Sequence, residues 1–183
     1  MRRLVLPLLV CLLVVAACGK HPKSAAPSTA QEQQAFSGSP PALASLHQKA
    51  SELVGGGTSA FKQELASLRG HPVVVNKWAA WCGPCRQEFP WFQQLSVKFG
   101  KRVAFIGVDS NDNSGDAKGF LKQFPVSYPS YSDPDLKIAA LMNAVGAFPT
   151  TIFYDPQGKI VATHIGAYQT KREMEQDIAR YAR

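Results

Sequence analysis

The sequence predicts one α/β domain in which helices cover both faces of a central β-sheet. Its 183 residues fit a single domain with extensions, since domains usually contain roughly 100 to 200 residues. Hydrophobic residues form 45% of the chain and charged residues 18%, a balance that provides a buried core and argues against general disorder. The third observation is the order of the local patterns, in which apolar runs typical of buried strands alternate with helical periodicity.

The individual elements follow from the spacing of apolar residues. A helical lead-in spans 42–70 and contains two short helices, the first over 42–54 and the second over 61–68. The apolar run from Val73 to Val75 predicts a strand buried on both faces, and Thr170 suits the cap of the last helix. The remaining predicted elements are helices over 84–99, 117–124, 136–142 and 171–181, and strands over 103–108, 150–154 and 160–165.

The N-terminus has the pattern of an export signal. Arg2 and Arg3 precede the mostly apolar segment 4–17, which ends in small residues and is too short for a membrane span of about 20 residues. Its last residues, Val15 to Cys18, resemble the lipobox of bacterial lipoproteins. This resemblance implies that Cys18 is lipidated and becomes the first residue of the mature protein. An ordinary cleavage site beside an unrelated cysteine is the alternative.

The chain therefore divides into three parts. Residues 1–18 form a lipoprotein-type signal peptide, and residues 19–41 are rich in Ser, Ala, Pro, Gln and Gly, which predicts a flexible tether. Residues 42–183 form the folded domain. We expect this domain to lie outside the cytoplasm, anchored to the bacterial cytoplasmic membrane through lipidated Cys18.

The charge distribution argues against nucleic-acid binding. The net charge is +7, and two of these charges, Arg2 and Arg3, belong to the removable signal. The other basic residues are spread along the chain and form no run interleaved with aromatic residues, so a solvated surface is the better interpretation.

Two cysteines remain in the folded domain. Cys11 lies in the signal and Cys18 at its end, which leaves Cys82 and Cys85 as a pair at the start of a predicted helix. There the unpaired N–H groups favour an anion, so we expect Cys82 to be the nucleophilic thiolate and the deeper Cys85 to resolve the mixed disulfide. A structural zinc site needs four ligands, and no second cysteine pair or His-x-His group is present. A purely structural disulfide would close too small a loop to stabilise the fold much.

The residues around this pair resemble a known family. Trp81 to Cys85 read WCGPC, the motif of thioredoxins, and Val73 to Pro90 are similar to the extracytoplasmic TlpA/ResA/DsbE branch. The segments 108–111, 128–134 and 145–151 follow in that family's order, so the resemblance covers about residues 66–183. It implies a thioredoxin-like fold, with a central mixed β-sheet flanked by helices and, here, an N-terminal helical extension.

The resemblance also implies site residues. Pro149 matches the cis-proline that lies beside the active cysteines and leaves the backbone of Phe148 free to pair with an extended substrate. The alternative is an ordinary trans proline at the start of a strand. The predicted substrate-binding residues are Trp81, Gly83, Pro84, Phe148 and Pro149.

Glu88 and Lys77 raise separate questions. Asn76 stands where cytoplasmic thioredoxins have a buried aspartate that takes the proton of the second cysteine, and an amide cannot do so. Glu88 matches a glutamate of ResA-like proteins that is implicated in managing this proton, although a surface glutamate at a helix N-terminus is the alternative. Lys77 replaces the usual Phe of the buried strand and needs a partner, such as Glu64, or a partly open sheet face.

We therefore expect a thiol-disulfide oxidoreductase, a disulfide reductase that acts on exported client proteins. No metal or organic cofactor is expected, since the Cys82–Cys85 pair carries the electrons. By analogy with the family, apocytochrome c is a candidate client during cytochrome c maturation, a membrane electron donor would reduce the protein again, and we expect a monomer.

Three alternatives use the same sequence features differently. A disulfide-forming oxidase would use the same residues, and Gly83-Pro84, the thioredoxin dipeptide, favours the reductase. A thiol peroxidase is less consistent, because Ala79 stands where peroxiredoxins have Thr. A Sco-like copper chaperone would have three residues between its cysteines, and its best candidate ligand, His164, is predicted to lie away from Cys82.

Overall fold

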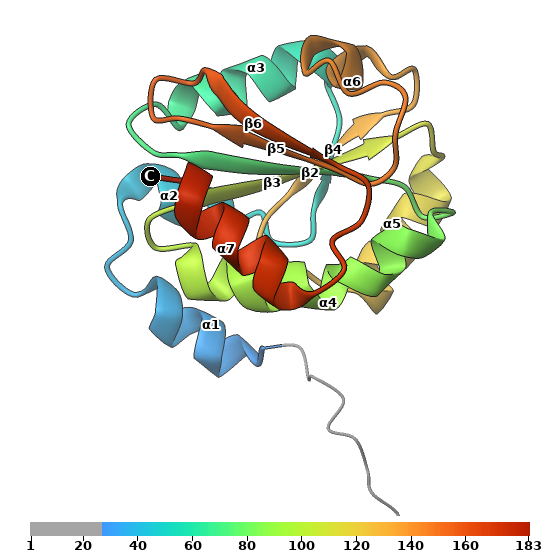
Figure 1. Cartoon of the computed structure of the whole chain (residues 1–183). Coiled ribbons are helices and arrows are strands. Elements are labelled where there is room, and N and C mark those ends of the chain that lie inside the picture. Colours follow the sequence, from blue (N-terminus) through green and yellow to red (C-terminus); the bar gives the residue numbers. More distant parts are fainter. Residues whose placement is uncertain (1–26) are drawn as a thin grey trace, which may run out of the picture.

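The computed structural model of the chain describes residues 27–183. This part forms a six-stranded mixed sheet with helices on both faces, which confirms the predicted architecture (Figure 1). The strands are β1 (Leu53–Val54), β2 (Val73–Trp78), β3 (Ala104–Ser110), β4 (Ser130–Asp133), β5 (Thr150–Tyr154) and β6 (Ile160–Ile165). They lie side by side in the order β1-β4-β3-β2-β5-β6.

The strand pairing brings the ends of β2 and β3 together. β1, β4, β3 and β2 are parallel to one another, β5 is antiparallel to β2, and β6 is antiparallel to β5. Trp78 at the end of β2 pairs with Asp109 of β3. Because the carboxyl ends of parallel strands meet at one edge of a sheet, residues that follow β2 and β3 gather there.

The helices form two layers. They are α1 (Thr29–Phe36), α2 (Pro41–His47), α3 (Gly57–Ser67), α4 (Gly83–Phe99), α5 (Ser114–Gln123), α6 (Lys137–Leu141) and α7 (Lys171–Tyr181). α4 and α7 cover one face of the sheet, and α3 and α6 cover the other (Figure 1). Val74 and Trp78 of β2 pack on the α4 side, whereas Val73 and Val75 belong to the core on the α3 side.

The prediction for residues 42–54 was wrong in its second half. α2 ends at His47, and Leu53–Val54 form the short edge strand β1 beside β4. Apolar residues at helical spacing do not distinguish a helix from a turn followed by a two-residue strand. The second predicted helix of the lead-in, over 61–68, corresponds to α3.

β4 was missed because its sequence lacks an apolar run. Its residues are mostly polar and buried, and their polar atoms form hydrogen bonds inside the protein. For example, the Trp78 indole N–H donates to Ser130 Oγ at 3.2 Å. A Cβ atom on Gly107 of β3 would lie 2.1 Å from Ser130 Oγ. Glycine at 107 is therefore what lets β4 approach β3.

The predicted flexible tether over 19–41 was wrong for the part that the structure describes. Residues 29–36 form α1, which Ser28 and Gln31 begin with a capping box. Phe36 at its end stacks on His47, with ring centroids 3.6 Å apart. Both ring nitrogens of His47 lie within 3.2 Å of backbone carbonyl oxygens, those of Ser127 and Gly100. The remaining tether residues, 19–26, and the signal peptide lie outside the described residues.

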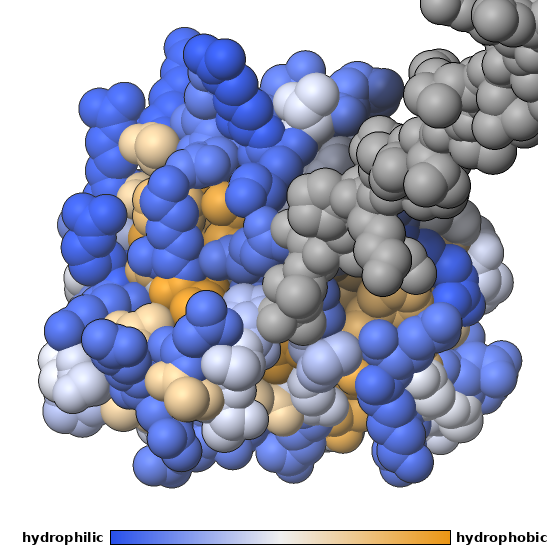
Figure 2. All heavy atoms as spheres, turned by 90° about the horizontal axis from the view of Figure 1, so that it is seen from below, coloured by the Kyte–Doolittle hydropathy of each residue, from blue (hydrophilic) through white to orange (hydrophobic). Residues whose placement is uncertain are grey.

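Elsewhere the predicted boundaries agree closely with the structure. β5, β6 and α7 have the predicted limits, and Thr170 caps α7 by accepting a hydrogen bond from the Glu173 N–H. On the side seen in Figure 2, hydrophilic side chains predominate and the hydrophobic atoms lie between them.

Candidate active site

The two cysteines of the folded domain lie at the N-terminus of α4. Cys82 is the N-cap residue, and its Sγ accepts a hydrogen bond from the Cys85 N–H at 3.1 Å. The two sulfur atoms form a disulfide bond. Gly83 begins the helix, and Pro84 suits the first turn because the N–H groups there have no intrahelical acceptor. Once the disulfide is reduced, this position favours a thiolate at Cys82.

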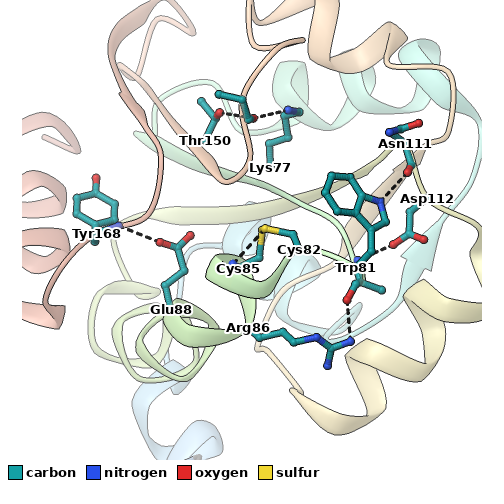
Figure 3. The surroundings of a disulfide bond; sticks show 12 residues. Lys77, Trp81, Cys82, Cys85, Arg86, Glu88, Asn111, Asp112, Thr150 and Tyr168 are labelled. Atoms are coloured by element: carbon teal, nitrogen blue, oxygen red, sulfur yellow. Dashed lines mark hydrogen bonds between the residues drawn. A yellow bond between two sulfur atoms is a disulfide. The ribbon is translucent and has the colours of Figure 1, made fainter.

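Accessibility separates the two sulfurs. Cys82 retains 3% of its surface and Cys85 none, so only Cys82 presents any surface to a substrate. In Figure 3 the disulfide lies between Trp81 on one side and Glu88 on the other. The structure thus brings together the two predicted cysteines and the predicted glutamate.

The loop before Cys82 is held by residues of α4 and of the loop that follows β3. Trp81 is 56% exposed, and its indole N–H donates to the Asn111 carbonyl at 2.9 Å. The Ala80 N–H donates to Asp112 Oδ2 at 2.5 Å, and the Ala80 carbonyl accepts from Arg86 Nη2 at 2.7 Å (Figure 3). These two hydrogen bonds fix the peptide groups on both sides of Ala80. They therefore hold the backbone that leads to the exposed Trp81.

Phe148 and Pro149, directly before β5, form the side of the site that faces the Trp81 ring. The peptide bond between them is cis, as the resemblance implied. The Phe148 ring lies 4.9 Å from the Trp81 ring, centroid to centroid. Pro149 precedes β5, whose neighbour β2 leads into the cysteine loop. The five predicted substrate-binding residues therefore lie on two segments that meet beside the disulfide.

Glu88 is buried, not a surface residue. It is 1% exposed on the inner face of α4, its Oε2 accepts a hydrogen bond from the Tyr168 N–H at 3.2 Å, and burial raises its pKa to about 8. A carboxyl group with this pKa exchanges its proton near neutral pH. Asn76 is also buried and has no titratable group.

Asp109 is a second buried acid that the sequence reasoning missed. It is 1% exposed at the end of β3, and burial, assisted by the nearby Asp112 and Asp133 carboxylates, raises its pKa to about 8. Its place directly at the carboxyl end of a buried strand was a usable signal. The roles of Asp112 and Arg86, which hold Ala80, could not be predicted in this way, because their contacts with Ala80 depend on how the loop folds.

Lys77 has a different partner from the one considered. Its Nζ donates to the Ala147 carbonyl at 2.6 Å and lies 3.4 Å from the centre of the Phe148 ring. Glu64 instead pairs with Lys49 and accepts a hydrogen bond from the Tyr131 hydroxyl. Lys77 is fully buried, so the open sheet face that was the other expectation is also wrong.

The comparisons with known proteins agree with this geometry. Residues 47–163, more than half of the chain, match the AhpC/TSA family. The chain belongs to this family. A thiol-disulfide oxidoreductase ResA of Bacillus cereus is 36% identical over 115 residues. That alignment covers 62% of this chain and 65% of ResA, so the chain spans slightly less than two thirds of this relative.

Solved structures of similar sequence share the fold of this chain. A putative thiol:disulfide interchange protein DsbE from Chlorobium tepidum matches with a TM-score of 0.59 and 34% identity, over 64% of this chain and 84% of that one. The pneumococcal exposed lipoprotein thioredoxin Etrx1 from Streptococcus pneumoniae matches with a TM-score of 0.56 and 25% identity, over 63% and 89%. The predicted thioredoxin-like fold and the similarity to ResA and DsbE are confirmed.

Three further observations concern metals and membranes. Within residues 27–183, no group of three or more His, Cys, Asp or Glu side chains is arranged to hold a metal ion. His164, the candidate copper ligand, stacks on the Tyr168 ring, with centroids 3.7 Å apart.

No helix within residues 27–183 is long and apolar enough to cross a bilayer. Cys18, the predicted lipidation site, lies outside the described residues.

Proposed function

We propose that this protein is a thiol-disulfide oxidoreductase whose reduced Cys82–Cys85 pair exchanges electrons with disulfides of exported proteins. The observation that carries the proposal is the cysteine pair at the N-terminus of α4, with Cys82 as N-cap and the Phe148-Pro149 segment beside it. The names of ResA and DsbE, the proteins that this chain resembles, support the same reaction.

The reaction proceeds in two exchanges. In the first, the Cys82 thiolate attacks one sulfur of a client disulfide, a Cys82–client disulfide forms, and the other client sulfur leaves as a thiolate that takes up a proton. In the second, the Cys85 thiol gives up its proton and attacks Cys82 Sγ. The Cys82–Cys85 disulfide forms, and the second client sulfur leaves and is protonated. Two electrons pass from the protein to the client. The Cys85 thiol releases one proton, and the second proton comes from solvent, because Cys82 enters the reaction as a thiolate.

The wall formed by Phe148 and Pro149 is the proposed docking site for the client. An extended client segment would pair with the backbone at Phe148 and lie against the exposed Trp81 ring. Trp81 immediately precedes Cys82 and its ring contacts the Phe148 ring, so a disulfide in such a segment would meet the nucleophile. Effective positioning of this kind lowers the barrier of a reaction between two groups.

We propose reduction as the physiological direction. Gly83-Pro84 is the thioredoxin dipeptide, which favours a reductant. Each turnover leaves a disulfide in the protein, so a membrane dithiol donor would have to return two electrons. Apocytochrome c is the proposed client by analogy, because reductases of the family that the sequence resembles commonly keep haem-attachment cysteines reduced.

We also propose that the protein acts outside the cytoplasm, held at the membrane by a lipid on Cys18. The leader from Arg2 to Cys18 supports this, as does the name of the pneumococcal structure, an exposed lipoprotein. The tether would then be shorter than 19–41, because residues 29–36 form α1.

A rate assay with two alternative substrates tests the proposed reaction. The reduced protein is mixed with a peptide disulfide or with hydrogen peroxide, and the formation of the Cys82–Cys85 disulfide is followed by alkylation and mass spectrometry. We expect rapid oxidation by the peptide, and loss of it in Cys82→Ser. Rapid oxidation by peroxide with no exchange with the peptide would identify a thiol peroxidase instead.

A further inference from the structure

Lys77 is a charged side chain inside the sheet core. It lies on β2, is fully buried, and pairs with Thr150 across the β2–β5 ladder. Lysine is almost never fully buried unless its charge has a partner. None of the ion pairs within residues 27–183 includes Lys77. Its partners are instead a backbone carbonyl and an aromatic ring.

Both partners belong to the segment that precedes β5. Lys77 Nζ donates to the Ala147 carbonyl at 2.6 Å, and the same carbonyl accepts from Thr150 Oγ1 at 2.9 Å (Figure 3). The ammonium group also lies 3.4 Å from the centroid of the Phe148 ring, which is within the range of a cation–π interaction. Lys77 thus fixes both the peptide orientation before Phe148 and the position of its ring.

The charge of Lys77 is available for these contacts at neutral pH. Burial lowers its pKa to about 8, and the negative charge of Asp133 opposes this shift. Asp133 is itself engaged, because it accepts hydrogen bonds from the backbone N–H groups of Ile138 and Ala139. The ammonium group is therefore directed to Ala147 and Phe148 and forms no salt bridge.

A chain of contacts joins Lys77 to the surface beside Cys82. The Phe148 ring contacts both the Lys77 ammonium and the Trp81 ring, whose centroid is 4.9 Å away. Trp81 is exposed and immediately precedes Cys82. A change at Lys77 is thereby transmitted to the surface on which a substrate would lie.

We propose that Lys77 is a positioning residue for peptide substrates: it holds residues 147–149 in the conformation that docks an extended client segment. This inference rests on the proposed function and adds the residue that determines how tightly a peptide disulfide binds. A buried charge generally stabilises a fold less than an apolar side chain of the same size. The presence of a lysine at position 77 is therefore better explained by its contacts with residues 147–148 than by a gain in core stability.

The test compares two substrates in reduced wild type and in Lys77→Met, which keeps the length of the side chain and removes its charge and its donor. One substrate is a ten-residue peptide with a disulfide, and the other is 5,5′-dithiobis(2-nitrobenzoate), which is too small to use the docking segment. In single-turnover reactions, we expect Lys77→Met to raise the half-saturating peptide concentration, the KM of this reaction, about tenfold at an unchanged maximal rate, and to leave the rate with the small disulfide within about twofold. Lys77→Arg, which keeps the charge, is expected to restore most of the peptide affinity.

Two further variants keep the test decisive. Lys137→Met removes an exposed lysine, paired with Asp135, and is expected to change neither rate. Thr150→Val removes the second donor to the Ala147 carbonyl and is expected to raise the peptide KM by a few fold, even if Lys77→Met does not fold. Equal losses with both substrates, or an unchanged peptide KM in both Lys77→Met and Thr150→Val, would overturn the proposal. Wild type that reacts with neither substrate would overturn the proposed function as well.

Discussion

Glu88 and Tyr168 are joined by a single hydrogen bond, in which the backbone N–H of Tyr168 donates to Glu88 Oε2 at 3.2 Å. Glu88 Oε1 is buried and has no hydrogen-bond partner within residues 27–183. A buried carboxyl oxygen without a partner favours the protonated acid, in agreement with the pKa of about 8 that burial gives Glu88. Glu88 lies one turn after Cys85 on α4, and we propose that it exchanges a proton with the resolving thiol.

We predict that Glu88→Gln slows the second exchange step. Glutamine keeps the size and hydrogen bonding of the side chain but cannot accept the proton of Cys85, and general-base assistance typically contributes about 10² to 10⁴ in rate. We expect a loss toward the lower end of that range, because a thiolate is reactive by itself, together with altered thiol titrations at both cysteines. Rapid-quench alkylation of the mixed disulfide measures the rate. The exposed Glu52→Gln is the matched control, and wild-type rates in Glu88→Gln would show that the proton leaves through water.

We predict that the oxidised protein becomes less stable as pH rises from about 5 to about 8. Burial raises the pKa of Glu88 from 4.5 to about 8 in the folded protein, so its stabilising contribution is complete below pH 4.5 and is lost as pH rises through about 8. Asp109, raised from 3.8 to about 8, acts in the same direction. Each group adds up to about 1.4 kcal/mol per pH unit to the slope.

Urea unfolding at several pH values measures this slope. Glu88→Gln and Asp109→Asn are each expected to reduce it by the contribution of one group, and the double variant by both. Curves for the two single variants that run parallel to the wild-type curve would contradict the prediction.

The fold was predictable wherever apolar periodicity decides the structure. β5, β6 and α7 have the predicted limits, because alternation along β6 and one apolar stripe on α7 each have a single interpretation. β4 was not predictable, since Ser130 and Asp133 are buried through hydrogen bonds to residues distant in sequence. α1 was missed because its composition resembles a linker, although Ser28 with Gln31 forms a cap of a known pattern.

The site was predictable where it lies in one stretch of sequence. Residues 81–85 and 148–149 were found from motifs, and the structure brings them together. The contacts of Ala80 with Asp112 and Arg86 depend on how loops meet at the sheet edge, which periodicity does not report. Lys77 was recognised as unusual, but its partner Ala147 is set by the β2–β5 pairing.

We predict that Cys18→Ser releases the protein from membranes. A lipid anchor supplies about 0.8 kcal/mol per buried CH₂ group, and the variant has no site for it. Cell fractionation with immunoblotting should then find the protein in the soluble extracytoplasmic fraction, with unchanged activity on a small disulfide. Membrane retention of the variant would identify an uncleaved anchor.

We predict a reduction potential near that of thioredoxin, about −270 mV, because the Gly83-Pro84 dipeptide is the same. Equilibration with glutathione or dithiothreitol buffers and alkylation of the free thiols measures it. A potential near −120 mV, as in strong oxidants, would reverse the proposed direction.

Trapping of the mixed disulfide tests the central claim most directly. Cys85→Ser leaves the Cys82 nucleophile and removes the resolving thiol, so incubation with a peptide disulfide should accumulate a covalent Cys82–peptide adduct in intact-mass spectra. Cys82→Ser, the matched control, should form little adduct, because Cys85 is buried. If Cys85→Ser forms no adduct, or if both variants form it equally, Cys82 is not the attacking residue of a two-thiol exchange.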